Sequence, residues 1–222
     1  AQYLAISSMV RSPATRVHLH VYEPPADFAS RAARLAGRWP GRLTVSHEPP
    51  GRNPYGSPSK FYFAAARFAI AGRLRESLAA PIVMVDADGL VVRDLAPGFE
   101  QFGGASAGFI RQFDSVAPYR QILASAIYLG VDEGARDFFT RLADAIQLAL
   151  ADRGRYHVDQ IAIHYALERR ASRGRPLDVA QVDEAWSDSD FSAGALIWST
   201  RGPRKARFEE LLATFRDLDD AA

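Results

Sequence analysis

The sequence predicts an α/β fold that forms a single domain over residues 1–222, and three observations support this prediction. Segments with helical periodicity alternate with short apolar segments typical of strands. The run Ile82–Val85 is apolar at every position, as in a central parallel strand covered on both faces. With 222 residues, of which 48% are hydrophobic, the chain is long enough to bury one sizeable core. The absence of an initial Met suggests that the domain is a fragment of a longer chain.

Charge and composition exclude several classes of partner. The net charge of +1 predicts no nucleic-acid partner and no attraction to a membrane surface. No apolar run approaches the roughly 20 residues that a membrane span requires. The absence of cysteine excludes disulfides and fits a reducing compartment, so we expect a cytoplasmic protein.

Helices and strands alternate in the first part of the predicted fold. Proline and glycine close the predicted helices, and strict alternation of apolar and polar residues indicates the first strand. A loop rich in proline and glycine over residues 49–58 is either a substrate loop or a plain surface connection. The predicted elements are helices over residues 1–10 and 26–37 and strands over residues 16–23 and 43–47.

The first predicted strand carries two histidines on one face, His18 and His20. Two histidines are half of a zinc site, but no third ligand of that kind lies nearby in the sequence. We therefore interpret them as the partly solvated face of a strand.

The next predicted helix, over residues 60–78, places an arginine in an apolar stripe. Arg67 shares a face with Phe63 and Ile70 by the three-and-four spacing of a helix. A buried guanidinium needs an anionic partner. The helix leads directly into the strand that ends at Asp86, so the partner is Asp86, Asp88 or a ligand phosphate; alternatively, Arg67 extends to solvent.

The apolar run ends in Asp86, Ala87, Asp88 and Gly89. In open α/β sheets ligands collect at the carboxyl ends of strands. Carboxylates at i and i+2 point to the same side, so Asp86 and Asp88 can both reach one hard cation. Such a site suits Mg²⁺ or Mn²⁺ holding a diphosphate. The alternative interpretation is a turn after a buried strand.

The second half of the chain is predicted to continue the alternation. The segment 132–152 is amphipathic and begins with acidic residues that suit the helix dipole. We expect a solvated acidic loop over residues 183–190. The other predicted elements are a turn at 96–98, strands over 105–113, 122–131, 177–182 and 195–198, and a helix over 206–218.

Asp159 and Gln160 lie in the first turn of a further predicted helix that begins at His157. Acidic residues near a helix start usually cap it and do nothing more. The residues alone therefore favour a capping role for Asp159 over a functional one.

Residues 199–205 form a basic turn that contains Gly202 and Lys205 and leads into the last helix. A glycine turn with basic side chains at a strand-to-helix junction can hold a diphosphate through backbone N–H groups, charge and the helix dipole. The alternative is a basic surface turn.

Taken together, these motifs resemble the GT-A glycosyltransferases, and more narrowly the retaining galactosyltransferase and glycogenin type. The resemblance rests on the order of four motifs over most of the chain: Arg67, the pair Asp86 and Asp88, Asp159-Gln160, and Gly202 with Lys205. It implies a Rossmann-like mixed sheet flanked by helices.

The resemblance also implies a function. Asp86, Ala87 and Asp88 would form the donor site, with Mn²⁺ or Mg²⁺ and the diphosphate of a UDP-sugar held by the two carboxylates. Asp86 would also lie near the sugar or the ribose. Arg67 would contact the donor, and Gly202 and Lys205 would hold its phosphates. Asp159 and Gln160 would face the reacting sugar and act as the catalytic residues. The expected enzyme is a retaining hexosyltransferase whose acceptor is an unidentified glycan, lipid or protein.

Two departures from the family pattern bear on this expectation. Ser199 stands where the family has a metal-binding histidine, so the third protein ligand is absent or replaced. The family's first strand, which carries the pocket for the nucleotide base, is expected before Ala1 and would then be missing from this chain.

Two rival interpretations remain open. Asp86 and Asp88 also resemble the Asp-x-Asp-Gly signature of haloacid dehalogenase phosphatases, although that motif normally follows the first strand. The other is a degenerate domain that binds a sugar nucleotide without turnover. Ser199 favours it, and the presence of Asp86, Asp88, Asp159 and Lys205 opposes it.

Overall fold

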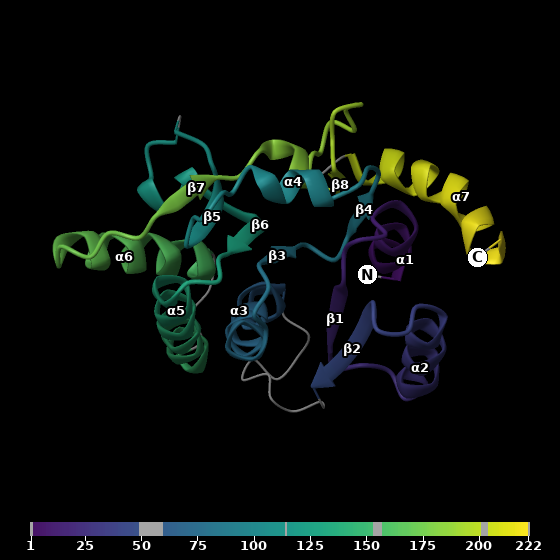
Figure 1. Ribbon diagram of the computed structural model, residues 1–222, viewed down its shortest axis with the longest axis horizontal. Coiled ribbons are helices and arrows are strands. Elements are labelled where there is room, and N and C mark those ends of the chain that lie inside the picture. Colours follow the sequence, from purple (N-terminus) through teal and green to yellow (C-terminus); the bar gives the residue numbers. More distant parts are fainter. Residues whose placement is uncertain (1, 49–59, 114, 153–156, 201–203, 222) are drawn as a thin grey trace.

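The computed structural model describes residues 2–48, 60–113, 115–152, 157–200 and 204–221. Its central sheet has four strands in the order β3-β6-β5-β7 and lies among helices (Figure 1). β6 runs antiparallel to both β3 and β5, whereas β5 and β7 are parallel, which makes the sheet mixed, as predicted. The strands are β3 (Ile82–Val85), β5 (Ala107–Arg111), β6 (Ile122–Leu129) and β7 (Val179–Gln181).

The expectation of a central parallel strand at Ile82–Val85 is wrong in position and direction. β3 stands at the end of the four-strand order and runs antiparallel to β6. Ile82 and Met84 pack against one apolar cluster, and Val83 and Val85 pack against another on the opposite face. The run is apolar at every position because both faces are covered, and this pattern carries no information about strand direction.

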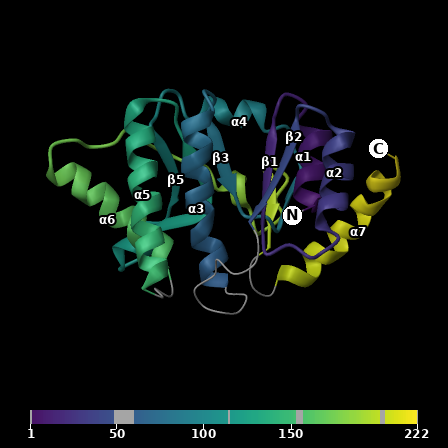
Figure 2. The same cartoon turned by 90° about the horizontal axis from the view of Figure 1, so that it is seen from below.

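Three helices cover one face of the sheet: α3 (Lys60–Ser77), α5 (Glu133–Ala151) and α6 (Val158–Ser172). Figure 2 shows α3 and α5 side by side in front of the strands. Phe68 from α3 and Phe138 from α5 are almost fully buried in one cluster with Phe109 from β5. The Asp132 carboxylate caps α5 by accepting from the Ala135 N–H at 2.9 Å, in agreement with the predicted helix start.

Short elements cover the other face: β4 (Gly89–Val91), α4 (Ala96–Glu100), the 3-10 helix η2 (Glu184–Ser187) and β8 (Ile197–Ser199). Two expectations are corrected in this layer. Residues 96–98 open a short helix instead of a turn, and the acidic segment 183–190 is anchored by Trp186, which is 1% exposed. The Trp186 ring packs perpendicular to Phe99, so apolar contacts hold this segment on the sheet.

The N-terminal part consists of α1 (Gln2–Arg11), β1 (Val17–Tyr22), α2 (Phe28–Arg38) and β2 (Leu43–Glu48). β1 and β2 form a separate parallel pair joined through α2, with Ala5, Met9 and Leu43 buried between the elements. The Ser7 hydroxyl accepts from the Val91 N–H at 3.0 Å, which ties α1 to β4. The predicted loop over residues 49–58 lies outside the described residues.

The last helix, α7 (Lys205–Ala221), runs along α1 and the β4–β8 pair (Figures 1 and 2). Its Phe208 is buried with Leu90 and Phe191, and Tyr3 of α1 packs against the same cluster. Arg204, just before the helix, forms a 2.6 Å ion pair with Asp190. Within the described ranges, no helix is long and apolar enough to cross a membrane.

Candidate active site

Arg67 organises a cluster of charges where β3 ends. Its Nη1 donates to the Asp86 carboxylate, and its Nη2 donates to the Ala124 carbonyl at 2.6 Å. The same Nη2 lies 3.7 Å from Asp159 Oδ2. The Arg67 and Asp159 side chains are 18% and 13% exposed, against 42% for Asp86. The predicted pairing of Arg67 with Asp86 is therefore present, and a second carboxylate shares the same guanidinium.

An irregularity in β6 supplies the main-chain partners of this cluster. The register between β5 and β6 steps from Phe109–Ile127 to Ile110–Leu123, so residues 124–126 of β6 fall within the step. There the Ala124 carbonyl accepts a hydrogen bond from Arg67 Nη2, and the Ser125 carbonyl accepts one from the Asp86 N–H at 3.1 Å. Bulged strands turn backbone groups away from their own ladder and are common beside active sites. The step leaves the Ala124 carbonyl for Arg67, whereas the Ser125 bond to Asp86 continues the β3–β6 ladder.

Asp159 and Gln160 reach this cluster from the first turn of α6. The Gln160 amide donates to the Ile122 carbonyl at 2.5 Å, and the Gln160 N–H donates to Asp159 Oδ1 at 2.9 Å. The other amide atom, Gln160 Oε1, is buried and has no hydrogen-bond partner among the described residues. The position before the helix is His157, whose backbone is left-handed with φ of 55° and whose side chain makes no capping bond. Asp159 therefore does more than cap a helix, since one oxygen meets Gln160 and the other faces Arg67.

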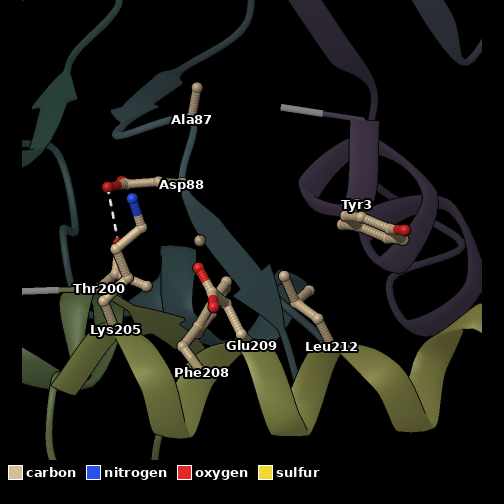
Figure 3. Close-up of a pocket in the computed structure, with 9 residues that line it drawn as sticks. Tyr3, Ala87, Asp88, Thr200, Lys205, Phe208, Glu209 and Leu212 are labelled. Carbon is tan, nitrogen blue, oxygen red and sulfur yellow. Dashed lines mark hydrogen bonds between the residues drawn. The ribbon is translucent and has the colours of Figure 1, made fainter.

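A pocket of about 410 Å³ lies beyond β3, between the β4–β8 pair, α1 and α7 (Figure 3). Asp88 and Lys205 lie toward one end, and Tyr3 lies at the other. Gly89 lines the floor, and a Cβ there would lie 2.9 Å from Ile197 Cγ2, so glycine is needed for the close approach of β4 to β8.

Thr200 is the partner of Asp88 in this pocket. Its hydroxyl donates to Asp88 Oδ2 at 2.7 Å, which the dashed line in Figure 3 marks. Ser199, the residue expected in place of the family's histidine, is buried, and its hydroxyl lies 3.0 Å from the Ser187 hydroxyl. Successive strand residues point to opposite faces, so Ser199 turns inward and Thr200 reaches the aspartate.

Comparison with known proteins adds to this geometry. No family model matches the chain, and no curated protein matches it. Among solved structures, it is similar to a glycosyltransferase involved in the glycosylation of the major capsid of PBCV-1, with a TM-score of 0.54, 11% identity and coverage of 87% of this chain and 98% of that one. The glycosyltransferase GlyE of Streptococcus pneumoniae TIGR4 gives a TM-score of 0.53 at 13% identity, over 94% of this chain and 57% of GlyE.

The chain has the fold of the GT-A glycosyltransferases. At identities of 11% and 13% the likeness is one of fold. A weaker likeness links the chain to mouse xyloside xylosyltransferase 1 in its apo form, with a TM-score of 0.48 and 16% identity over 83% of this chain and 79% of that one. The fold predicted from the order of the motifs is confirmed.

The GT-A fold places the predicted site residues in two groups. Arg67, Asp86, Asp159 and Gln160 form one group over β6. Ala87, Asp88 and Lys205 line the pocket, and Gly202 lies outside the described residues. Asp86 bonds Arg67, and Asp88 bonds Thr200.

Three pocket residues with polar side-chain atoms were not predicted as site residues from the sequence: Tyr3, Thr200 and Glu209. Thr200 had a signal, because it lies in the predicted basic turn that follows a predicted strand. Tyr3 and Glu209 had none, since they meet only when α7 packs near α1, about 200 positions away in the chain.

The oxygen atoms near Asp88 suit a hard cation. The Asp88 carboxylate and the Thr200 hydroxyl are adjacent, and Mg²⁺ and Mn²⁺ prefer such ligands. In the described part of the chain, no group of three or more His, Asp or Glu residues is placed to hold a metal ion. The described residues thus supply Asp88 and Thr200 as ligands, a small set of the kind Mg²⁺ uses when substrate phosphates bind it as well.

Proposed function

We propose that this protein is a glycosyltransferase that moves a hexose from a nucleotide-diphosphate sugar, with UDP as the nucleotide, to an unidentified glycan, lipid or protein acceptor. The observation that carries the proposal is the pocket that Asp88 and Lys205 both line. Asp88 is only two residues along the chain from Asp86, which belongs to the charged cluster with Arg67. The GT-A fold supports it. The same fold argues against the phosphatase interpretation, which rested on the Asp86 and Asp88 signature alone.

The pocket has the chemistry to receive a nucleoside diphosphate in one direction. Lys205 supplies a cation near Asp88, and Lys205 opens helix α7, whose N-terminal dipole also favours phosphate. The half-buried ring of Tyr3 at the far end supplies a surface for a nucleotide base. The donor sugar, attached to the second phosphate, would then extend toward Asp86.

A divalent cation fits the proposed site. Asp88 and Thr200 would hold it from the pocket side, and Asp86 would reach it while keeping its bond to Arg67. When bound, Mn²⁺ or Mg²⁺ supplies positive charge that stabilises the diphosphate as a leaving group. This small ligand set predicts that metal and nucleotide bind together.

The Arg67 cluster is suited to the sugar. As the bond between the anomeric carbon and the phosphate oxygen breaks, its electron pair leaves with the diphosphate and positive charge develops on the ring. Asp86, Asp159 and Gln160 Oε1 offer negative or dipolar oxygen atoms to that charge. Arg67 keeps both carboxylates oriented through its ion pairs. The acceptor hydroxyl then bonds to the anomeric carbon and passes its proton to the departing diphosphate oxygen, and we propose retention of configuration at that carbon.

Calorimetric titration of UDP tests the donor site. We expect binding with Mn²⁺, little binding with EDTA, and loss of the metal-dependent part in Asp88→Ala. The matched control is Asp144→Ala, which removes an exposed carboxylate from α5. UDP binding that is unchanged in Asp88→Ala would refute the assignment of this pocket.

Turnover separates the enzyme from the degenerate domain. An active enzyme should hydrolyse or transfer sugar from UDP-hexoses in the presence of Mn²⁺, and proton NMR of the product reports the anomeric configuration. UDP binding without either reaction would favour a domain that binds sugar nucleotides only, as the buried Ser199 suggests.

A further inference from the structure

Helix α7 presents three kinds of side chain to the pocket in a fixed order. Lys205, Glu209 and Leu212 all line the pocket and follow one another at spacings of four and three residues, which puts them on one helix face. At 1.5 Å per residue, Glu209 lies about 6 Å and Leu212 about 10 Å along the axis from Lys205. Figure 3 shows the order from the Asp88 end: Lys205, Glu209, then Leu212 opposite Tyr3.

This order of charge matches one class of ligand. A cation, then a carboxylate, then an apolar and aromatic end corresponds to phosphate, then ribose, then base in a nucleoside diphosphate. A ligand lying along α7 in the direction already proposed would place its ribose opposite Glu209.

The carboxylate of Glu209 would repel an anionic ligand in this pocket unless it has a hydrogen-bonding role. Together with Asp88 it adds negative charge to a pocket proposed to receive phosphates, which is unfavourable unless the carboxylate binds donors. The ribose 2′ and 3′ hydroxyls are two adjacent O–H donors, and a carboxylate accepts two hydrogen bonds side by side. Acidic residues perform this role on ribose in dinucleotide-binding folds.

We propose that Glu209 accepts hydrogen bonds from the ribose hydroxyls of the donor and thereby selects ribonucleotides over 2′-deoxyribonucleotides. This inference rests on the proposed function, because it concerns the nucleotide of the same donor. The competing role for Glu209 is an i,i+4 ion pair with Lys205 that contributes only to the exposed face of α7.

Titration of UDP, 2′-deoxy-UDP and inorganic pyrophosphate with Mn²⁺ tests the proposal in wild type, Glu209→Gln and Glu210→Gln. Glu210 is the control, since it is exposed on the same helix and does not line the pocket. Wild type should bind UDP about tenfold or more tightly than 2′-deoxy-UDP, as expected for hydrogen bonds to a charged group. Glu209→Gln should weaken UDP, leave 2′-deoxy-UDP nearly unchanged and leave pyrophosphate unchanged or tighter, whereas Glu210→Gln should behave as wild type.

The outcomes separate the two proposals. UDP binding by wild type with equal affinity for the 2′-deoxy compound would overturn the role of Glu209 while leaving the donor site in place. Equal weakening of all three ligands in Glu209→Gln would also overturn it, because this result indicates an effect through Lys205. Failure of wild type to bind any of the three would overturn the donor site itself, and the role of Glu209 with it.

Discussion

Two polar clusters of this protein bind their side chains in different ways. The arginine cluster, Arg67 with Asp86 and Asp159, is charged and is held by carbonyl oxygens of β6. The histidine cluster, His18 and His20 with Thr44 and Ser46 on β1 and β2, is held by hydroxyls. Burial lowers the pKa of both His18 and His20, which favours the neutral form.

The difference separates a site from a structural network. His18 bonds Thr44 and Ser46 at 2.8 Å each, and His20 bonds Ser46 at 2.7 Å, so hydroxyls on the neighbouring strand answer three of the four ring nitrogens. The interpretation of these histidines as a strand face, and not half a zinc site, agrees with this network. In the arginine cluster one cation serves two carboxylates, and the Asp86 side chain is 42% exposed. A carboxylate such as Asp86, charged and accessible to a ligand, is the kind of group that can stabilise charge developing in a reaction.

The largest effect should come from Arg67→Leu. It removes the cation from Asp86 and Asp159 and leaves the Ala124 carbonyl without its donor. We expect the free energy of unfolding in guanidinium titrations to fall by about 2–4 kcal/mol, mainly through Asp159, because the exposed Asp86 is partly screened by solvent. Arg73→Leu is the control, since Arg73 is on the same helix, pairs with Glu48 at 2.9 Å and is 56% exposed. Equal losses in the two variants would show that burial of the cluster contributes nothing.

Asp159→Asn should lower stability slightly and activity strongly. The amide keeps the shape of the carboxylate and Arg67 keeps Asp86, so we expect a stability loss of about 1 kcal/mol. Turnover of the sugar donor should nevertheless fall by roughly a hundredfold or more, because a charge near the reacting carbon is lost. Asp137→Asn offers a comparison: this aspartate pairs with Arg141 and Arg170 away from the cluster, and kcat should be unaffected. Undiminished turnover in Asp159→Asn would remove it from the catalytic residues.

The smallest effect should come from the histidine cluster and should depend on pH. Folding lowers the pKa of His18 and His20 below 6.5, so the unfolded chain binds more protons as pH falls through that value. Stability is therefore complete above about pH 6.5 and is lost progressively below it. The double variant His18→Asn/His20→Asn should flatten the dependence of the unfolding free energy between about pH 5 and 7.5. A wild-type curve as flat as that of the variant would contradict the neutral assignment.

The arginine cluster was open to prediction because its signals are local. Arg67 interrupts an apolar helix face, and that helix leads into the strand that ends at Asp86, so spacing and order made Asp86 one of the predicted partners, beside Asp88, a ligand phosphate and solvent. Asp159 was indicated only by the family resemblance, because an acidic residue in a first helical turn is ordinary and only the packing of α6 on β6 brings it to Arg67.

The pocket lined by Asp88 and Lys205 was predicted in part. Asp88 and Lys205 follow from a strand end and a basic turn, but which of Ser199 and Thr200 reaches Asp88 depends on where β8 begins. The direction of β3 could not be predicted for a different reason. An apolar run indicates that both faces of a strand are buried, but it does not indicate the direction of the strand that it bonds to. Tyr3 and Glu209 depend on the packing of the last helix near the first, which no local pattern encodes.

The irregular step in β6 affects how the site tolerates sequence change. Arg67 and Gln160 bind the carbonyl oxygens of Ala124 and Ile122, and every residue type carries such an oxygen. Substitutions at these two positions that respect burial should therefore leave the cluster intact, whereas deletion of one residue within 124–126 would shift the carbonyls away from their donors. Divergent relatives of this chain should vary in the identity of these residues and keep the length of the segment.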